Sequence, residues 1–170
     1  MNRRSFLQAG LAAVPTTSLA FGQTRANRTP PLKDFQLAYA PHFGMFKHNA
    51  GNDPVAQLEW AHDQGFTAWE DNGMTRRSPD EQKRIAKAME RLGMRMGVFV
   101  ANFGTAFGEK TFTSGKKDSM DNFLKDLSKS AEVGKRVNAK WMTIVLGTKD
   151  HRLPTEFQHA NAIEMLRRGA

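Results

Sequence analysis

The sequence predicts an α/β fold with a parallel sheet. Apolar runs of strand length alternate with segments in which apolar residues recur at helical spacing. The strand-like runs are almost continuously apolar, which is typical of parallel strands that are covered on both faces. With 170 residues and 39% hydrophobic content, the chain has the composition of one globular domain.

Four runs are expected to form the strands, and the first three begin about 30 residues apart, which is the length of one βα unit. They are Phe35–Ala40, Phe66–Glu70, Arg95–Ala101 and Trp141–Leu146. A polar, glycine-containing loop from Asn102 to Asp118 accounts for the longer third unit. Four such units could form half of a (β/α)₈ barrel or a complete, small doubly wound sheet, and periodicity does not choose between the two.

Helix boundaries follow from capping residues. Asp53 followed by Pro54 predicts a helix start, and Gly65 predicts the end of that helix. Ser78-Pro79-Asp80-Glu81 is a capping box, in which the serine hydroxyl and the Glu81 carboxylate would each accept a hydrogen bond from a backbone amide at the helix start. Two further helices are expected, over Ser119–Val137 and from Thr155 onwards.

The first 26 residues have the pattern of an export signal. Arg3 and Arg4 precede an apolar stretch, and the segment contains no acidic residue. The apolar part, Leu11–Phe21, is too short to span a bilayer, because a span needs about 20 apolar residues. Small residues favour cleavage after Ala20 or Ala26. The paired arginines resemble the twin-arginine signal, which implies a periplasmic or other extracytoplasmic location.

Residues 27–34 contain two prolines and are expected to form a linker after the signal.

Charge and cysteine content restrict the kinds of molecule that this chain is expected to bind. Three of the cations behind the net charge of +8 lie in residues 1–26. The remaining cations alternate with acidic residues along the predicted helices, which indicates solvated faces and no nucleic-acid site. The absence of cysteine excludes disulfides and thiolate metal sites.

Three polar residues are expected together at the carboxyl end of the sheet. Because alternate side chains of a strand face opposite sides, Glu70 lies on the face opposite to Trp69, which is expected beneath the helices. Glu70 also ends its strand, where both barrels and open α/β sheets bind ligands. By the same parity, His42 follows the first strand and Asn102 follows the third.

Each of these residues also has a local interpretation. Glu70 could cap a loop amide or pair with a lysine, His42 could hydrogen-bond its own loop, and Asn102 could form a turn. The spacing of His42 and His48 matches no metal site. The sequence also lacks a dinucleotide-binding glycine motif, a phosphate loop, a nucleophile elbow and a His-Glu-x-x-His motif, which argues against nucleotide-binding and serine-hydrolase functions.

Three runs together resemble the amino-terminal half of hydroxypyruvate isomerase-like proteins. They are YAPHFGMFKHNAGNDPVAQLEWAHDQGFTAWEDNGM, RLGMRMGVFVANF and VNAKWMTIVLG. These proteins belong to the xylose isomerase-like superfamily of sugar and sugar phosphate isomerases and epimerases, which are TIM barrels. The resemblance implies that residues 35–170 form about four βα units of a parallel (β/α) barrel of the TIM type, that is, a half-barrel.

The resemblance also implies a reaction class. In such enzymes a divalent metal such as Mg²⁺ or Mn²⁺ polarises a sugar or hydroxycarbonyl substrate, and two glutamates move a proton through an enediolate. The metal ligands and both glutamates come from strands five to eight, so the resemblance assigns no catalytic or metal-binding residue here. The chain alone is expected to bind no metal and to be inactive. The substrate-binding residues expected in it are His42, Glu70, Asn102 and Lys149.

A second functional interpretation is a non-catalytic, exported binding or assembly module. A half-barrel has two exposed sheet edges, which favour association with another copy or with a separate second half. A third interpretation, a barrel endonuclease, typically needs a histidine-rich zinc cluster, and strand ends that carry Glu70 and Asn102 do not supply one.

Overall fold

The computed structural model describes residues 35–102 and 110–170, so the expected signal (1–26) and linker (27–34) lie outside the described residues. The described chain is a mixed helix and sheet structure with a small parallel sheet, in agreement with the predicted α/β class. Its elements in chain order are α1 (Lys47–Ala50), α2 (Pro54–Asp63), β1 (Ala68–Trp69), the 3₁₀ helix η1 (Met74–Arg76), α3 (Pro79–Arg91), β2 (Arg95–Met96), α5 (Thr111–Ser114), α6 (Lys117–Arg136) and α7 (Thr155–Gly169).

The parallel segments pair in the order of the sequence. β1 pairs with β2 in parallel. An isolated parallel bridge joins His42 to Glu70, and a second one joins Val100 to Thr143. The chain just after the first predicted strand therefore lies beside β1, and the fourth predicted strand lies beside the chain that continues β2.

The two outer predicted strands do not form regular strands, so this part of the sequence prediction is wrong. Phe35–Ala40 has no strand residue, and Trp141–Leu146 contributes a single bridge at Thr143. The two inner strands are confirmed but span two residues each. Within 35–102 and 110–170, the outer segments have a neighbouring segment on one side only, and side chains such as Leu37 (65% exposed) and Trp141 (74% exposed) face solvent. Strand propensity alone does not hold such a segment in a sheet, because strand stability comes from cross-strand packing.

The capping residues place the starts of α2 and α3 as predicted. Asp53 Oδ2 accepts a hydrogen bond from Ala56 N at 3.1 Å at the start of α2. Ser78 Oγ accepts one from Glu81 N at 3.2 Å at the start of α3. The capping box forms only in part, because Glu81 Oε1 accepts instead from Arg77 Nη1 at 2.8 Å. Arginine is a charged donor and outcompetes a backbone amide for the carboxylate.

The last helices also agree with the sequence pattern. α6 covers the predicted range within two residues, and α7 begins at Thr155 as expected. Part of the expected loop from Asn102 to Asp118 is helical, because α5 occupies Thr111–Ser114. Within 35–102 and 110–170, no helix is long and apolar enough to cross a membrane.

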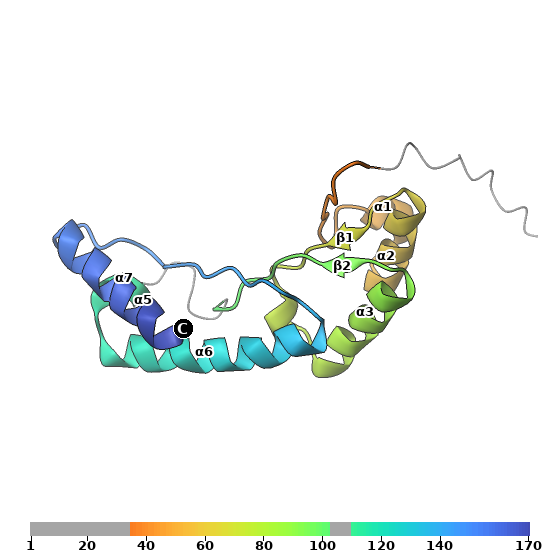
Figure 1. The fold of residues 1–170 in the computed structure, drawn as a ribbon. Helices are drawn as coiled ribbons and strands as arrows, with labels where there is room; N and C mark the ends of the chain where they lie inside the picture. Colours follow the sequence, from red (N-terminus) through yellow and green to blue (C-terminus); the bar gives the residue numbers. More distant parts are fainter. Residues whose placement is uncertain (1–34, 103–109) are drawn as a thin grey trace, which may run out of the picture.

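The main core lies between one face of the strands and the helices that cover it. Trp69 is 0% exposed, as its predicted place beneath the helices requires, and its ring centroid lies 4.9 Å from that of Phe43. Figure 1 shows α3 and α6 on the same side of the strands. Residues from α2, α3, α6 and the strands close this core, among them Leu58, Ile85, Met89, Phe99 and Val133. The helices thereby hold β1 and the loop that follows it in place.

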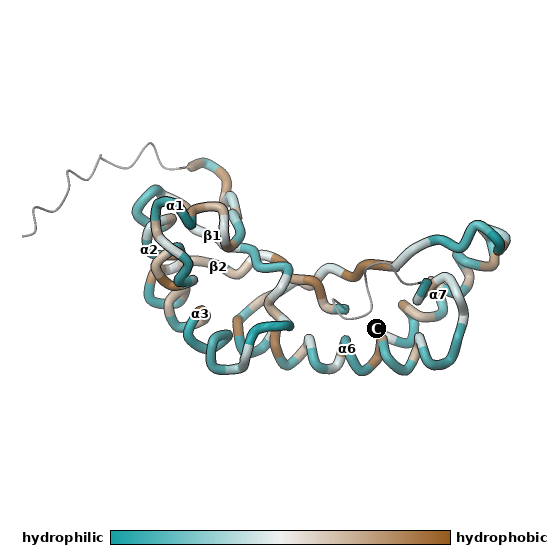
Figure 2. Tube along the Cα trace, turned by 180° about the vertical axis from the view of Figure 1, so that it is seen from behind, coloured by the Kyte–Doolittle hydropathy of each residue, from teal (hydrophilic) through white to brown (hydrophobic). Residues whose placement is uncertain are grey.

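A second, smaller core lies at the far end of α6. Phe112 of α5, Phe123 of α6 and Met165 of α7 are buried together. Because α6 contributes to both cores, the molecule is elongated, with the strands near one end and α7 near the other (Figure 1). Figure 2 shows that part of the extended chain opposite α6 is hydrophobic.

Candidate functional site

The candidate site lies at the carboxyl end of β1, where Glu70 directly follows the strand. Glu70 N donates to Pro41 O at 2.9 Å, which fixes the end of β1 against the segment that carries His42. A Cβ atom built on Gly97 would lie 3.5 Å from Ala40 Cβ and 3.7 Å from Glu70 Cβ. Glu70 therefore lies on the same face as these small residues and opposite the buried Trp69, as the strand parity predicts.

The Glu70 carboxylate is positioned by the residue two places further on. Asn72 Nδ2 donates to Glu70 Oε1 at 3.1 Å, and Glu70 is half-buried whereas Asn72 is exposed. The loop backbone continues the sheet contacts, since Val100 N donates to Asn72 O at 3.4 Å. Sequence reasoning did not select Asn72, although its place in the run Glu70-Asp71-Asn72 after the strand was a usable signal.

His42 is brought beside Glu70, as expected. The two residues are partners in a parallel bridge. The His42 ring is exposed, and Nδ1 lies 3.1 Å from Phe43 O. Its other ring nitrogen, Nε2, is the atom through which this exposed imidazole could meet a ligand.

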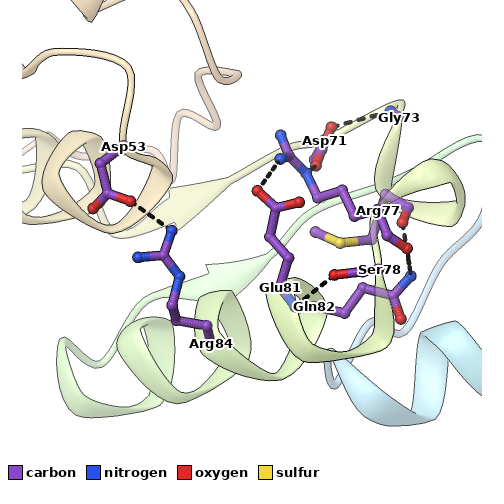
Figure 3. Close-up of polar contacts among 9 residues, drawn as sticks. Asp53, Asp71, Gly73, Arg77, Ser78, Glu81, Gln82 and Arg84 are labelled. Carbon is purple, nitrogen blue, oxygen red and sulfur yellow. Dashed lines mark hydrogen bonds and ion pairs between the residues drawn. The ribbon is translucent and has the colours of Figure 1, made fainter.

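A hollow of about 720 Å³ opens beside His42 and Asn72. One wall is a charge network in which Arg77 lies between two carboxylates. Arg77 Nε donates to Asp71 Oδ2, and Arg77 Nη1 donates to Glu81 Oε1 at 2.8 Å. Figure 3 shows these side chains converging between the loop after β1 and the start of α3. The guanidinium also lies over the Phe43 ring, 4.7 Å from the ring centroid.

Residues on this side of the hollow also form hydrogen bonds with backbone atoms, and these bonds hold the loop after β1 in place. Asp71 is 7% exposed and accepts from Gly73 N at 3.0 Å. Gln82, which is 2% exposed, donates to Met74 O at 2.9 Å and to Arg77 O at 3.0 Å. Sequence reasoning missed this network. The usable signals were an aspartate two residues before Gly73 and an arginine four residues before Glu81.

Asn102 has a different set of contacts from Glu70 and His42. It is 0% exposed, its Nδ2 donates to Val145 O at 2.7 Å, and its Oδ1 accepts from Val145 N at 3.0 Å. These bonds continue the backbone pairing in which Ala101 N donates to Thr143 O at 2.9 Å. The amide thus acts like one more residue of strand backbone and aligns the fourth segment. Neither a turn nor a solvent-facing position describes it.

Lys149 is exposed in the loop that leads to α7, beside a well-organised carboxylate. Asp150 is 7% exposed and forms ion pairs of 3.1 Å with both Arg152 and Lys110. Hydrogen bonds from the Arg152 side chain and backbone, together with one from Lys110, hold the pKa of Asp150 well below its usual range. Gln158 closes the loop, with Oε1 accepting from Asp150 N at 2.8 Å. Asp150 therefore stays ionised and orders the loop that carries Lys149.

The described residues do not fit the divalent metal that the resemblance implies. Nowhere in the described ranges do three or more His, Cys, Asp or Glu side chains converge as a metal site requires. Near Glu70, the two other carboxylates, Asp71 and Glu81, already share Arg77. A carboxylate paired with a guanidinium is a poor metal ligand, because the cation already neutralises its charge.

Comparisons with known proteins add no assignment. No model of a known protein family matches the chain. A search of curated proteins finds no significant match.

Proposed function

We propose that this chain is the substrate-binding half of an exported barrel of the sugar or hydroxypyruvate isomerase and epimerase type. The observation that carries the proposal is the position of Glu70. It lies at the carboxyl end of β1, faces away from the core, and stands beside His42. This is the end of the sheet at which barrels bind their substrates.

The sheet order supports the half-barrel in preference to a doubly wound sheet. Four segments pair in parallel and in sequence order, whereas doubly wound sheets reverse their order at a switch point. The helices of the main core cover the face that carries Trp69, and Ala40, Gly97 and Glu70 lie together on the opposite face. A barrel has this arrangement, with helices outside and strands facing a common interior.

The chemistry of the rim is suited to holding a small hydroxycarbonyl compound. The Glu70 carboxylate can accept a hydrogen bond from a substrate hydroxyl, and the His42 imidazole can donate to or accept from a neighbouring oxygen. The Asn72 amide and the Arg77 network keep the surrounding loop in place. No proton transfer is assigned to these residues, so the chain alone should bind a substrate without converting it.

A titration tests this function. Hydroxypyruvate or a ketose, added to the purified chain in a calorimeter, should bind, and Glu70→Gln should weaken binding about tenfold or more because a charged acceptor is lost. Glu90→Gln, at an exposed position of α3, is the matched control and should bind like the wild type. Equal affinity of wild type and Glu70→Gln would refute the assignment of the site.

The same preparation tests whether the chain is inactive by itself. With Mg²⁺ or Mn²⁺ added, we expect no isomerisation of either compound above the uncatalysed rate. Turnover by the purified chain would refute this part of the proposal.

A non-catalytic, exported assembly module is the second candidate function. The observation in its favour is that the outer segments of the sheet carry exposed apolar side chains, including Leu37 and Trp141. If the chain formed a stable oligomer and bound no hydroxycarbonyl compound, that result would favour the assembly module.

A further inference from the structure

In the part of the chain that the structure describes, the outer segments of the sheet, 35–42 and 141–146, each pair with one neighbouring segment. Glu70 N donates to Pro41 O at 2.9 Å on the inner side of the first segment. On the inner side of the last segment, Thr143 N donates to Phe99 O at 2.8 Å. Among the described residues, no backbone hydrogen bond from another segment reaches the opposite side of either one. Both edges are therefore open to a further strand.

The side chains on these two edges are unusually apolar for a surface. Of the ten exposed large hydrophobic side chains among the described residues, six lie on them: Phe35, Leu37, Tyr39, Trp141, Met142 and Leu146. Exposed apolar edge strands are a liability that proteins normally cover or protect with charge. A covering partner should therefore contact both edges.

The edges differ in side-chain size. The first segment carries Ala38 and Ala40, which line a hollow of about 1140 Å³ together with Trp141 of the last segment. Trp141 is 74% exposed, so most of its surface meets no other described residue. Barrel interiors are filled with side chains in layers, so small residues on one strand require large ones nearby. Where the two segments line this hollow, the first contributes the small Ala38 and Ala40 and the last contributes the large Trp141.

We propose that a second copy of this chain covers both edges, so that two copies together form one closed sheet of eight parallel segments. This inference rests on the half-barrel architecture of the proposed function. A two-fold rotation places segment 141–146 of one protomer beside segment 35–42 of its partner, and the reverse contact forms at the same time. Eight is the number of parallel strands in such a barrel, and closure leaves no edge exposed.

A second copy fits better than an unrelated strand for two reasons. It offers one edge of each kind, so a single type of contact made twice satisfies both. It also brings the large side chains of its last segment beside Ala38 and Ala40. In a closed parallel sheet all strands have their carboxyl ends at the same end of the barrel. Glu70 and Glu70 of the partner subunit would therefore line the same opening, and the two protomers would share the substrate site.

Light scattering of the full chain is the primary test. We expect a mass of twice 19.0 kDa that falls toward the single-chain mass on dilution. Leu146→Asp should raise the dissociation constant about tenfold or more, because it buries a charge at the edge contact. Phe157→Asp is the matched control, since Phe157 on α7 is 48% exposed and Leu146 is 43% exposed. The control should leave the dissociation constant unchanged.

A second measurement follows the edge tryptophan of the wild-type protein and uses the conservative variant Trp141→Phe only as a reference. The difference between the fluorescence of the wild type and that of Trp141→Phe gives the emission of Trp141 apart from that of Trp60 and Trp69. In concentrated wild-type protein this component should be several-fold less accessible to acrylamide than in dilute protein.

A folded monomer at every concentration would overturn the proposal and leave a different polypeptide as the partner of the edges. Equal weakening of self-association by Leu146→Asp and Phe157→Asp, or a Trp141 component that stays fully accessible, would also overturn it. A monomer that still binds a hydroxycarbonyl compound through Glu70 would leave the proposed function intact, so the two failures are distinguishable.

Discussion

Asn102 holds Val145, 43 residues away in the sequence, through two hydrogen bonds of 2.7 and 3.0 Å between its side-chain amide and the Val145 backbone. The amide supplies one donor and one acceptor, which are the groups that a strand backbone would supply at this place. The fourth segment depends on this contact for its alignment, because it has only one bridge to the rest of the sheet among the residues that the structure describes.

Asn102→Ala should destabilise the chain by about 1–3 kcal/mol, because it leaves the Val145 amide and carbonyl without these partners. Asn102→Asp should be at least as harmful, since it places a carboxylate against a carbonyl oxygen at a fully buried position. Urea unfolding followed by circular dichroism measures both. The control is Asn122→Ala, at an exposed position of α6. A loss no larger than that of the control would show that Asn102 does not align this segment.

The pair of Asp71 and Arg77 should contribute more to stability than an exposed ion pair. Their side chains are 10% and 21% exposed, whereas those of Asp53 and Arg84 are 46% and 52% exposed. In double-mutant cycles with Asn and Gln replacements, we expect a coupling of about 1–3 kcal/mol for the first pair and about 0.2–1 kcal/mol for the second. Asn keeps the helix cap at position 53. Equal couplings in the two cycles would contradict the assigned role of the Arg77 network.

The Asp150 ion pairs should make stability depend on pH in the acid range. Because Arg152 and Lys110 hold the folded-state pKa of Asp150 below its value in the unfolded chain, the carboxylate stabilises the fold above the unfolded value of about 4. That contribution is lost as the pH falls toward the folded-state pKa. The melting temperature of Asp150→Asn should therefore lie below that of the wild type at pH 7, and the difference should shrink as the pH falls below about 4. A difference that stays constant down to the lowest pH would contradict this explanation.

Export should depend on the paired arginines. Replacing both Arg3→Lys and Arg4→Lys should retain the protein in the cytoplasm, whereas Arg25→Lys should leave export unchanged, because it lies outside the pair. Fractionation of cells that express each variant measures the location. Normal export of the double variant would rule out the twin-arginine route.

The parts of the fold that the sequence predicts correctly are those fixed by local contacts. Asp53 and Ser78 cap α2 and α3 through amides three residues away, so their effect is visible in the sequence itself. The opposite orientation of Trp69 and Glu70 follows from the geometry of one strand. The Asp71, Arg77 and Glu81 network was equally local, and attention to spacings of six and four residues could have found it.

The parts that could not be predicted depend on distant partners. Whether Phe35–Ala40 and Trp141–Leu146 become strands is decided by what lies beside them, and apolar composition does not report this. The contact between Asn102 and Val145 connects two segments separated by α5 and α6, so no local pattern records it. The Asp150 pairs likewise require Lys110, 40 residues earlier in the chain.

The central claim is that a small hydroxycarbonyl compound binds at the rim beside Glu70, and its location can be observed directly. We would record amide spectra of the ¹⁵N-labelled chain during a titration with hydroxypyruvate. The largest shift changes should fall on residues 42–44 and 70–73, and Glu70→Gln should abolish most of them. Changes centred instead on the larger hollow, around Met94, Val137 and Trp141, or no changes at all, would contradict the claim.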